Sequence, residues 1–174
     1  MKIIDLTLPL YNGMPVYPGD LEIEIELIQN FKETAWNMRR IHMNLHDGTH
    51  INLPIHGLAE GKSLNDYEVD DFIGESYLYE NDQSIKKDKG IIFNQDITWE
   101  NAHKIAEIRP KFVGSWAKND IDIDIEKYFF EKDILIFERL TNTDKLPKKF
   151  IFHGVPLNIR DADGSPIRAY AIIN

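Results

Sequence analysis

The chain has 174 residues, a length that suits one domain better than two, and we expect residues 1–174 to form a single domain. Hydrophobic residues make up 43% of it and charged residues 28%, which argues against a disordered, collagen-like or coiled-coil protein. The 29 acidic residues outnumber the 20 basic ones, and the resulting charge of -9 argues against a nucleic-acid partner.

Three further absences narrow the class of protein. Cysteine does not occur, so neither a disulfide framework nor a thiolate metal site is available. The apolar runs, such as Ile134–Phe137, are too short to cross a bilayer. Met1 is followed directly by Lys2, without the basic flank and long apolar segment of a signal peptide. We therefore expect a cytoplasmic protein that does not bind a membrane.

Alternation of apolar and polar residues predicts strands in the first part of the chain. Lys2–Leu6 is the first candidate, and the segment Tyr11–Gly19, rich in proline and glycine, is expected to be a rigid loop. In Leu21–Leu27 four apolar residues alternate with three glutamates, so we expect one face to pack and the other to meet water. The same alternation in Arg40–His46 predicts a second strand of this kind.

The rest of the chain combines short strands with two helices. Thr98 is expected to cap a helix at Trp99–Ile108, and a second helix is expected at about 124–132. The charge run Lys86–Gly90 is expected to be a solvated turn. Because strands outnumber helices in an irregular order, we predict a mixed α/β fold. The remaining strands are expected at Tyr77–Tyr79, Gly90–Phe93, Lys111–Val113, Ile134–Phe137, Phe150–Phe152 and Ile167–Ile172.

Four of the six histidines lie between His42 and His56. Pro54 argues against a helix in this stretch, so a strand end that runs into a loop is the better interpretation. In an extended chain, the even-numbered residues would share one face, with the imidazoles converging at its tip. The residues concerned are His46, His50, Asn52 and His56.

Converging neutral imidazoles are a ligand set suited to Zn, Mn, Fe or Ni. The alternative is a polar strand face that is rich in histidine and binds no metal. A single histidine is more often a surface or core residue than a ligand, and this is our interpretation of His103 and His153.

The stretch His46–His56 reads H-D-G-T-H-I-N-L-P-I-H. It resembles the H-x-G-T-H-x-D-x-P-x-H motif of the cyclase family of metal-dependent hydrolases, which includes bacterial kynurenine formamidases (arylformamidases) and isatin hydrolases. Further segments resemble that family in the same order from one end of the chain to the other. These segments are Asp5–Thr7 with Gly13–Asp20, Phe137–Pro147, and Asp163–Ala169.

The resemblance implies a swivelling β/β/α fold, a homodimer or homotetramer, and a divalent metal, with Zn or Mn expected. Asn52 stands where the family has a ligating aspartate, and Glu126 where it has a second-site histidine. A neutral amide bridges cations poorly, so we expect one ion per chain. Glu126 is either a further ligand or a solvated helix residue. The roles implied for single residues are metal binding for His46, His50, Asn52 and Glu138, proton transfer for His56, and a substrate contact for Tyr17.

The reaction implied by the resemblance is hydrolysis of a small amide, formamide or lactam. The ion would polarise the carbonyl and lower the pKa of bound water, and His56 would act as general acid and base. The alternative, favoured by the changes at Asn52 and Glu126, is a catalytically impaired relative that binds a small molecule or a metal.

Overall fold

In the computed structural model, which describes residues 1–80 and 86–173, nine strands form one mixed sheet. Along the sheet the order is β1-β11-β9-β5-β6-β7-β8-β4-β10. The run from β5 to β8 is parallel, and the other neighbours are antiparallel. The strands are β1 (Lys2–Asp5), β4 (His50–Asn52), β5 (Ile73–Leu78), β6 (Gly90–Ile92), β7 (Phe112–Trp116), β8 (Leu135–Leu140), β9 (Lys149–His153), β10 (Gly164–Pro166) and β11 (Tyr170–Ile173).

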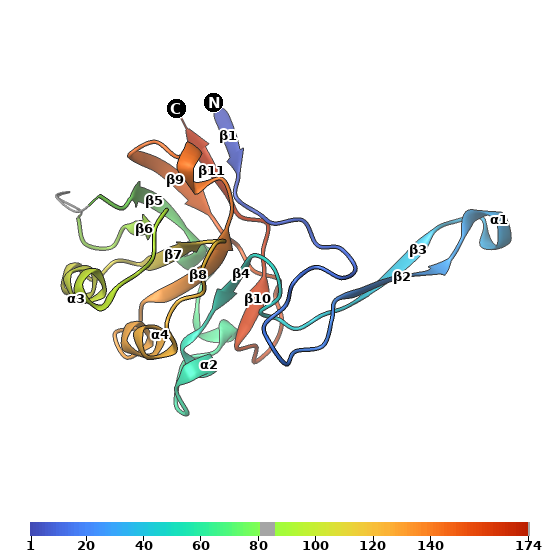
Figure 1. Cartoon of the computed structure of the whole chain (residues 1–174), viewed down its shortest axis with the longest axis horizontal. Coiled ribbons are helices and arrows are strands. Elements are labelled where there is room, and N and C mark those ends of the chain that lie inside the picture. The colour runs from blue at the N-terminus through green and yellow to red at the C-terminus, as the bar shows by residue number, and fades with distance from the viewer. Residues whose placement is uncertain (81–85, 174) are drawn as a thin grey trace.

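Two helices, α3 (Trp99–Ile108) and α4 (Ile123–Phe130), cover one face of this sheet (Figure 1). One apolar cluster fills the space between the helices and the sheet, and a second cluster includes residues of β1, β9 and β11. Short 3₁₀ turns lie at Leu64–Asp66, Val69–Phe72 and Thr143–Lys145. None of the helices formed by the described residues has the length and apolar character needed to cross a membrane.

The structure confirms most of the predicted elements and the mixed α/β class. The helix at Trp99–Ile108 is present, and the Thr98 hydroxyl oxygen accepts a hydrogen bond from the Asn101 N–H. Strand β10 was not predicted, and Ile167, predicted to begin the last strand, only forms an isolated bridge with Pro156. That residues 1–174 form one domain stays a prediction.

The sequence predicted that Pro54 would prevent a helix, and at Pro54 itself this prediction was wrong. Pro54 is the first residue of the short helix α2 (Pro54–Gly57). Proline is favoured there because its fixed φ suits a helix and its missing N–H would have had no partner in the first turn. The helix therefore begins at the residue that was expected to prevent one.

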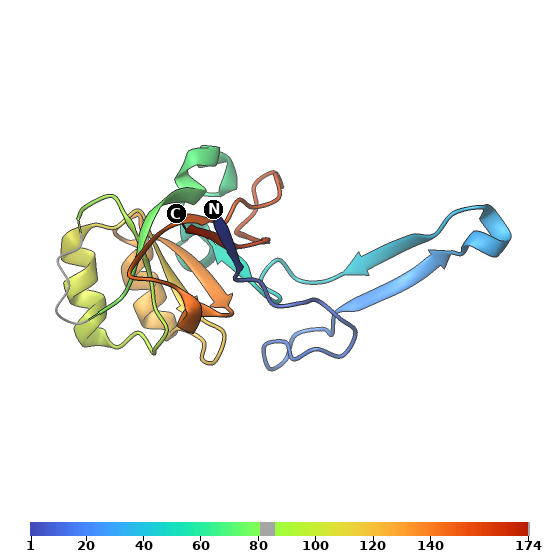
Figure 2. The same cartoon turned by 90° about the horizontal axis from the view of Figure 1, so that it is seen from above.

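A hairpin projects from the body, and we call its residues 24–42 the arm (Figures 1 and 2). It consists of β2 (Glu24–Gln29), the short helix α1 (Phe31–Thr34) and β3 (Met38–His42). The sequence predicted two strands here, and both exist with shifted bounds. The expectation that their apolar face packs holds at Ile23, which is 2% exposed, but was wrong within the arm, where Leu27 and Ile41 are each 47% exposed.

Strand pairing brings distant parts of the sequence to β4. This strand lies between β8 and β10, with His50 opposite Glu138 and Asn52 opposite Gly164. A single three-residue strand thus connects the histidine-rich segment with the C-terminal segment that contains Asp163 and with the end of the parallel sheet.

Candidate metal centre

His46 lies in a tight turn before β4, whereas His50 and Asn52 are on β4 itself and His56 is in α2. The turn requires Gly48, whose φ is 66° and whose added Cβ would lie 2.6 Å from a methyl carbon of Leu10. The imidazoles converge as expected: the ring centroids of His46 and His56 are 3.9 Å apart. The extended chain that was expected to bring them together is instead a turn, a strand and a helix.

These side chains line a pocket of about 540 Å³. Tyr17 lies at the pocket as well and is half-exposed, and its contact with a substrate stays a prediction. The pocket therefore collects every residue that the sequence singled out for metal binding, proton transfer or substrate contact. They are Tyr17, His46, His50, Asn52, His56, Glu126 and Glu138.

The Asn52 side chain connects both sides of the pocket floor and is only 2% exposed. Its amide nitrogen donates to one oxygen of Glu126 and to one oxygen of Glu138, both at 3.0 Å. Its amide oxygen lies 2.7 Å from Nδ1 of His46. Two carboxylates on the nitrogen side fix which end of the amide is which, because a carboxylate accepts hydrogen bonds and the amide oxygen cannot donate one.

Glu126 is buried, which excludes the interpretation of a solvated helix residue. Burial and the nearby Glu138 raise the pKa of Glu126, whereas the Asn52 amide opposes that rise. Burial also raises the pKa of Glu138, but contacts from His50, the Ile121 N–H and Asn52 outweigh it and lower that pKa overall. One member of the pair therefore favours its protonated form and the other its charged form.

Glu138 has no ion pair with either Arg139 or Arg168. Arg139 pairs with Asp120, and Arg168 pairs with Asp5. The charge of Glu138 is met instead by hydrogen-bond donors of the pocket floor, which is how buried carboxylates are usually stabilised.

Glu126→Gln is expected to leave the metal-free protein as stable as the parent or more stable. Glutamine keeps an oxygen for the Asn52 amide and removes a buried acid that lies beside Glu138. Because folding raises the pKa of Glu126 above 4.5, the stability that this acid contributes is lost as the pH rises from that value through the raised pKa. The gain in Tm of the variant should thus grow from about pH 5 to about pH 8.

Thermal melts of both proteins in the presence of a chelator measure this difference. Glu107→Gln, on the exposed side of α3, is the matched control and should show no such growth. A Glu126→Gln protein that is less stable than the parent at the higher pH would contradict the assignment of a protonated Glu126.

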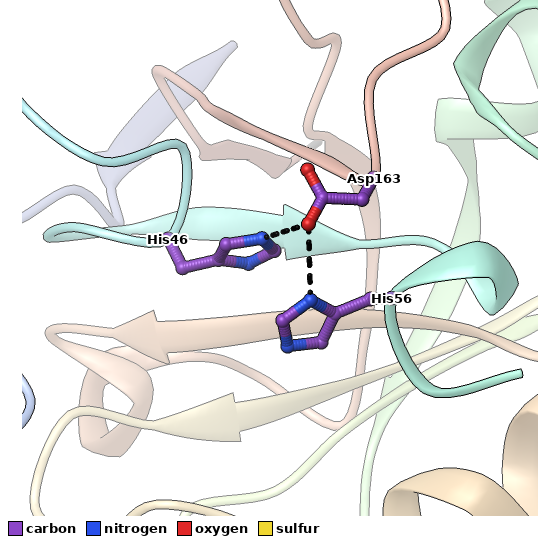
Figure 3. Close-up of side chains that lie close together, drawn as sticks. All are labelled: His46, His56 and Asp163. Atoms are coloured by element: carbon purple, nitrogen blue, oxygen red, sulfur yellow. Dashed lines mark hydrogen bonds and ion pairs between the residues drawn. The ribbon is translucent and has the colours of Figure 1, made fainter.

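His46, His56 and Asp163 form a second cluster of side chains (Figure 3). One carboxylate oxygen of Asp163 lies 2.9 Å from Nε2 of His46 and 3.2 Å from Nδ1 of His56. Burial and the neighbouring His46 lower the pKa of His56, although Asp163 opposes this. Among the described residues, this is the only group of three His, Asp or Glu side chains whose ligand atoms all lie within 4.8 Å of one another.

Asp163 was not predicted as a site residue. It is 107 residues from His56 in sequence, and its only signal was its place in the C-terminal segment that resembles the family. The next residue must be small, because a Cβ on Gly164 would lie 2.4 Å from the ring of His46. Asp163 thus places its carboxylate next to the His46 ring, and Gly164 places a backbone without a side chain there.

His50 lies deeper than the other two histidines. Its Nδ1 is 2.9 Å from the Gly48 carbonyl oxygen and therefore carries the proton, while Nε2 faces Glu138 at 3.4 Å. The ligand set implied by the resemblance, with His46, His50, Asn52 and Glu138, stays a prediction. The donors present, imidazole nitrogens and carboxylate oxygens, fit a divalent ion such as Zn or Mn.

The chain is similar in sequence to proteins from several microorganisms. A kynurenine formamidase from Bacillus cereus is 27% identical over 95% of this chain and 95% of its own. An uncharacterized protein from Methanocaldococcus jannaschii is 33% identical over 99% of this chain and 100% of its own.

Solved structures share the fold at lower identity. Isatin hydrolase A from Ralstonia solanacearum superposes with a TM-score of 0.81 and 16% identity, covering 99% of this chain and 92% of its own. A predicted metal-dependent hydrolase from Bacillus stearothermophilus gives a TM-score of 0.76 and 24% identity, covering 98% and 97%. These likenesses confirm the predicted cyclase-like fold. The Cyclase family model matches residues 4–115, more than half of the 174 residues, and the chain belongs to the cyclase family.

Proposed function

We propose that this protein is a metal-dependent hydrolase of a small amide, formamide or lactam. The observation that carries this proposal is the convergence of two imidazoles and a carboxylate, those of His46, His56 and Asp163, in a pocket of about 540 Å³. Pockets of roughly 300–1,000 Å³ are typical for small-molecule ligands. The similarity to a kynurenine formamidase and the shared fold with isatin hydrolases support the same class of reaction.

The ion, when bound, would polarise the substrate carbonyl and lower the pKa of its bound water. The residues that line the pocket determine which substrates can enter it. Carboxylates of Asp20, Asp120 and Asp163 line the pocket and make it unfavourable for an anionic substrate. Tyr17 offers an aromatic ring at the same pocket, which suits a flat ring on the substrate. A neutral aryl amide or cyclic amide fits both features.

We propose one tightly held ion per chain, with Zn and Mn as the candidates. Asn52 supports this number, because its amide nitrogen donates to the two carboxylates that a second ion would need. Mass spectrometry of the purified protein should find no more than one divalent ion per chain. Two ions per chain at full occupancy would contradict the proposal.

Turnover is tested on the same metal-loaded protein with a panel of N-formyl anilines, lactams and lactones. Hydrolysis that disappears with a chelator and returns with Zn or Mn supports the enzyme. Metal binding without turnover of any compound supports the alternative, a relative that binds a metal or a small molecule.

We also propose that the protein is a homodimer that forms through the arm. Two-stranded hairpins are at best marginally stable alone, and this one exposes large apolar residues that no other part of the described chain covers. A second copy of this chain is the partner that is present in every sample of the protein. Symmetric pairing of two arms would cover the same residues on both. The exposed residues are Leu27, Ile28, Phe31, Trp36, Met38 and Ile41.

A further inference from the structure

We propose that the substrate carries an apolar extension, a further ring or alkyl group, that binds in a second pocket beside the first. This inference rests on the proposed function and specifies the substrate class as an extended rather than a compact neutral amide. The first pocket is the one of about 540 Å³ that the histidines line. The second pocket has a volume of about 610 Å³, and Asp120 and Arg139 line both pockets.

One wall of the second pocket is apolar and comes from the segment that precedes the arm. In this wall Met14 is buried, Val16 is half-buried and Tyr11 is exposed. No side chain of the wall carries a charge, so a neutral apolar group gains most by leaving water there. The other residues that line the pocket are more polar and consist of residues 117–120 and Arg139. The apolar wall contains Leu8, Pro9, Tyr11, Met14, Pro15 and Val16.

The side chain of Thr49, which is buried, connects the apolar wall with Arg139. Its hydroxyl accepts a hydrogen bond from the Leu8 N–H at 2.9 Å and donates one to the Arg139 carbonyl oxygen at 2.8 Å. Thr49 is the neighbour of His50 in sequence, so the segment that places a histidine in the first pocket also joins two parts of the second. A preformed pocket binds a ligand without the further cost of ordering its walls.

Asp120 and Arg139 form the boundary that the two pockets share, and their charges compensate each other. Nε and Nη2 of Arg139 lie 3.1 and 3.0 Å from the same oxygen of Asp120. A ligand that crosses this boundary therefore meets no unpaired charge from these two residues, which suits a neutral extension. Because the pair engages the edge of the guanidinium, its flat face can stack on an aromatic ring of the ligand.

The backbone of Arg139 gives an independent indication that this side chain has a function. Its φ is 56°, in the left-handed region that residues other than glycine, asparagine and aspartate rarely adopt. Such conformations cost stability and concentrate at active sites and ligand sites. The long side chain is nevertheless only 17% exposed. Arg139 is therefore the specificity-determining residue at the point where the extension leaves the first pocket.

The size of the pockets separates an extended substrate from a compact one. Each pocket by itself has the roughly 300–1,000 Å³ that is typical of a small-molecule site. A compact amide thus occupies the first pocket and leaves the apolar wall in water, whereas an extended amide also covers Met14 and Val16. Because the burial of each CH₂ group favours binding, an extension of four carbons should tighten binding at least about tenfold.

The test compares the affinities of formanilide and 4-butylformanilide by isothermal titration calorimetry, with a chelator present to prevent metal-dependent turnover. The longer compound should bind at least about tenfold more tightly. Val16→Asn and Arg139→Asn should each reduce this ratio at least about threefold. Asparagine is chosen at position 139 because it tolerates the left-handed backbone. Val155→Asn, which changes an exposed valine that lines neither pocket, is the matched control and should keep the ratio.

Nuclear magnetic resonance of ¹³C-methyl-labelled methionines gives a second readout on the parent protein. 4-Butylformanilide should shift the Met14 methyl signal, formanilide should not, and the signal of Met38 in the arm should stay unchanged with both. A Met14 signal that the longer compound does not shift, or equal affinities for the two compounds, would overturn the assignment of the second pocket. Hydrolysis of neither compound by the metal-loaded protein, together with a Met14 shift, would overturn the proposed function and leave the second pocket standing.

Discussion

Asn52→Asp is expected to destabilise the metal-free protein strongly and to make its stability depend on divalent ions. The substitution keeps the shape of the side chain but replaces an N–H donor of a buried network by an oxygen. Glu126 and Glu138, each 3.0 Å from that nitrogen, would then face a third acceptor. Like charges in one buried site raise the pKa of one of them and lower the stability of the fold.

The expected loss is about 3 kcal/mol, the lower end of the cost of breaking a buried charge pair. For a chain of this length it corresponds to a fall in Tm of roughly 6–12 °C. Addition of Zn or Mn should restore the Tm, because a cation among three carboxylates removes their repulsion. Binding to the folded state alone stabilises it in proportion to the logarithm of the ion concentration.

Thermal melts with chelator and with increasing Zn measure both effects. Asn44→Asp adds the same charge to the wall of the pocket without entering the Asn52 network, and its Tm with chelator should match that of the parent. An Asn52→Asp protein that melts like the parent with chelator would show that the amide does not hold the two carboxylates. A destabilised variant that Zn does not rescue would show that no cation site faces position 52.

Local patterns predicted the helix at Trp99–Ile108 and most strands because the apolar period and the cap at Thr98 are properties of neighbouring residues. The site was less predictable. Asp163 reaches His46 because β10 pairs with β4, and such a contact between residues 117 apart leaves no periodic trace in the sequence. The even spacing of the histidines correctly indicated convergence, although Gly48 and Pro54 break the extended chain on which that inference relied.

In the arm, the sequence pattern indicates an apolar surface without indicating what covers it. Alternation in Leu21–Leu27 indicates that one face of a strand is apolar, but it cannot say whether that face meets the same chain or another one. Both strands are present, and Ile25 lies opposite Ile41 in the hairpin. In the proposed dimer, the residues that complete the packing belong to the second copy, so the pattern predicts an apolar surface but not what covers it.

Replacing Leu27 and Ile41 by aspartate is expected to convert the proposed dimer into a monomer. Both residues lie on the apolar face of the hairpin, and each is half-exposed in a single chain. Burial of a leucine or isoleucine contributes roughly 1.5–3 kcal/mol, and a symmetric interface counts each site twice. Aspartate removes this contribution and adds the cost of desolvating a charge.

Analytical ultracentrifugation should find the parent at about twice 20.3 kDa and the double variant at 20.3 kDa. Arg40→Asp, on the opposite face of β3, changes the net charge by the same two units and should leave the dimer intact. A monomeric parent, or a double variant that stays dimeric, would contradict the role of the arm.

Dissociation of the proposed dimer should also make the wall of the pocket more mobile, because the arm lies in the sequence between two segments of that wall. β2 begins four residues after Asp20, and β3 ends two residues before Asn44, and both of these residues line the pocket. In the dimer both strands are held at their far end by the partner copy, so their near ends have little freedom. In the monomer the hairpin lacks that support, and the wall residues should become more mobile. Hydrogen exchange at residues 17–20 and 43–45 should therefore speed up in the Leu27→Asp, Ile41→Asp protein and stay unchanged in Arg40→Asp. Zn affinity should change little, because His46 in the turn before β4, His56 in α2 and Asp163 just before β10 all lie outside the arm.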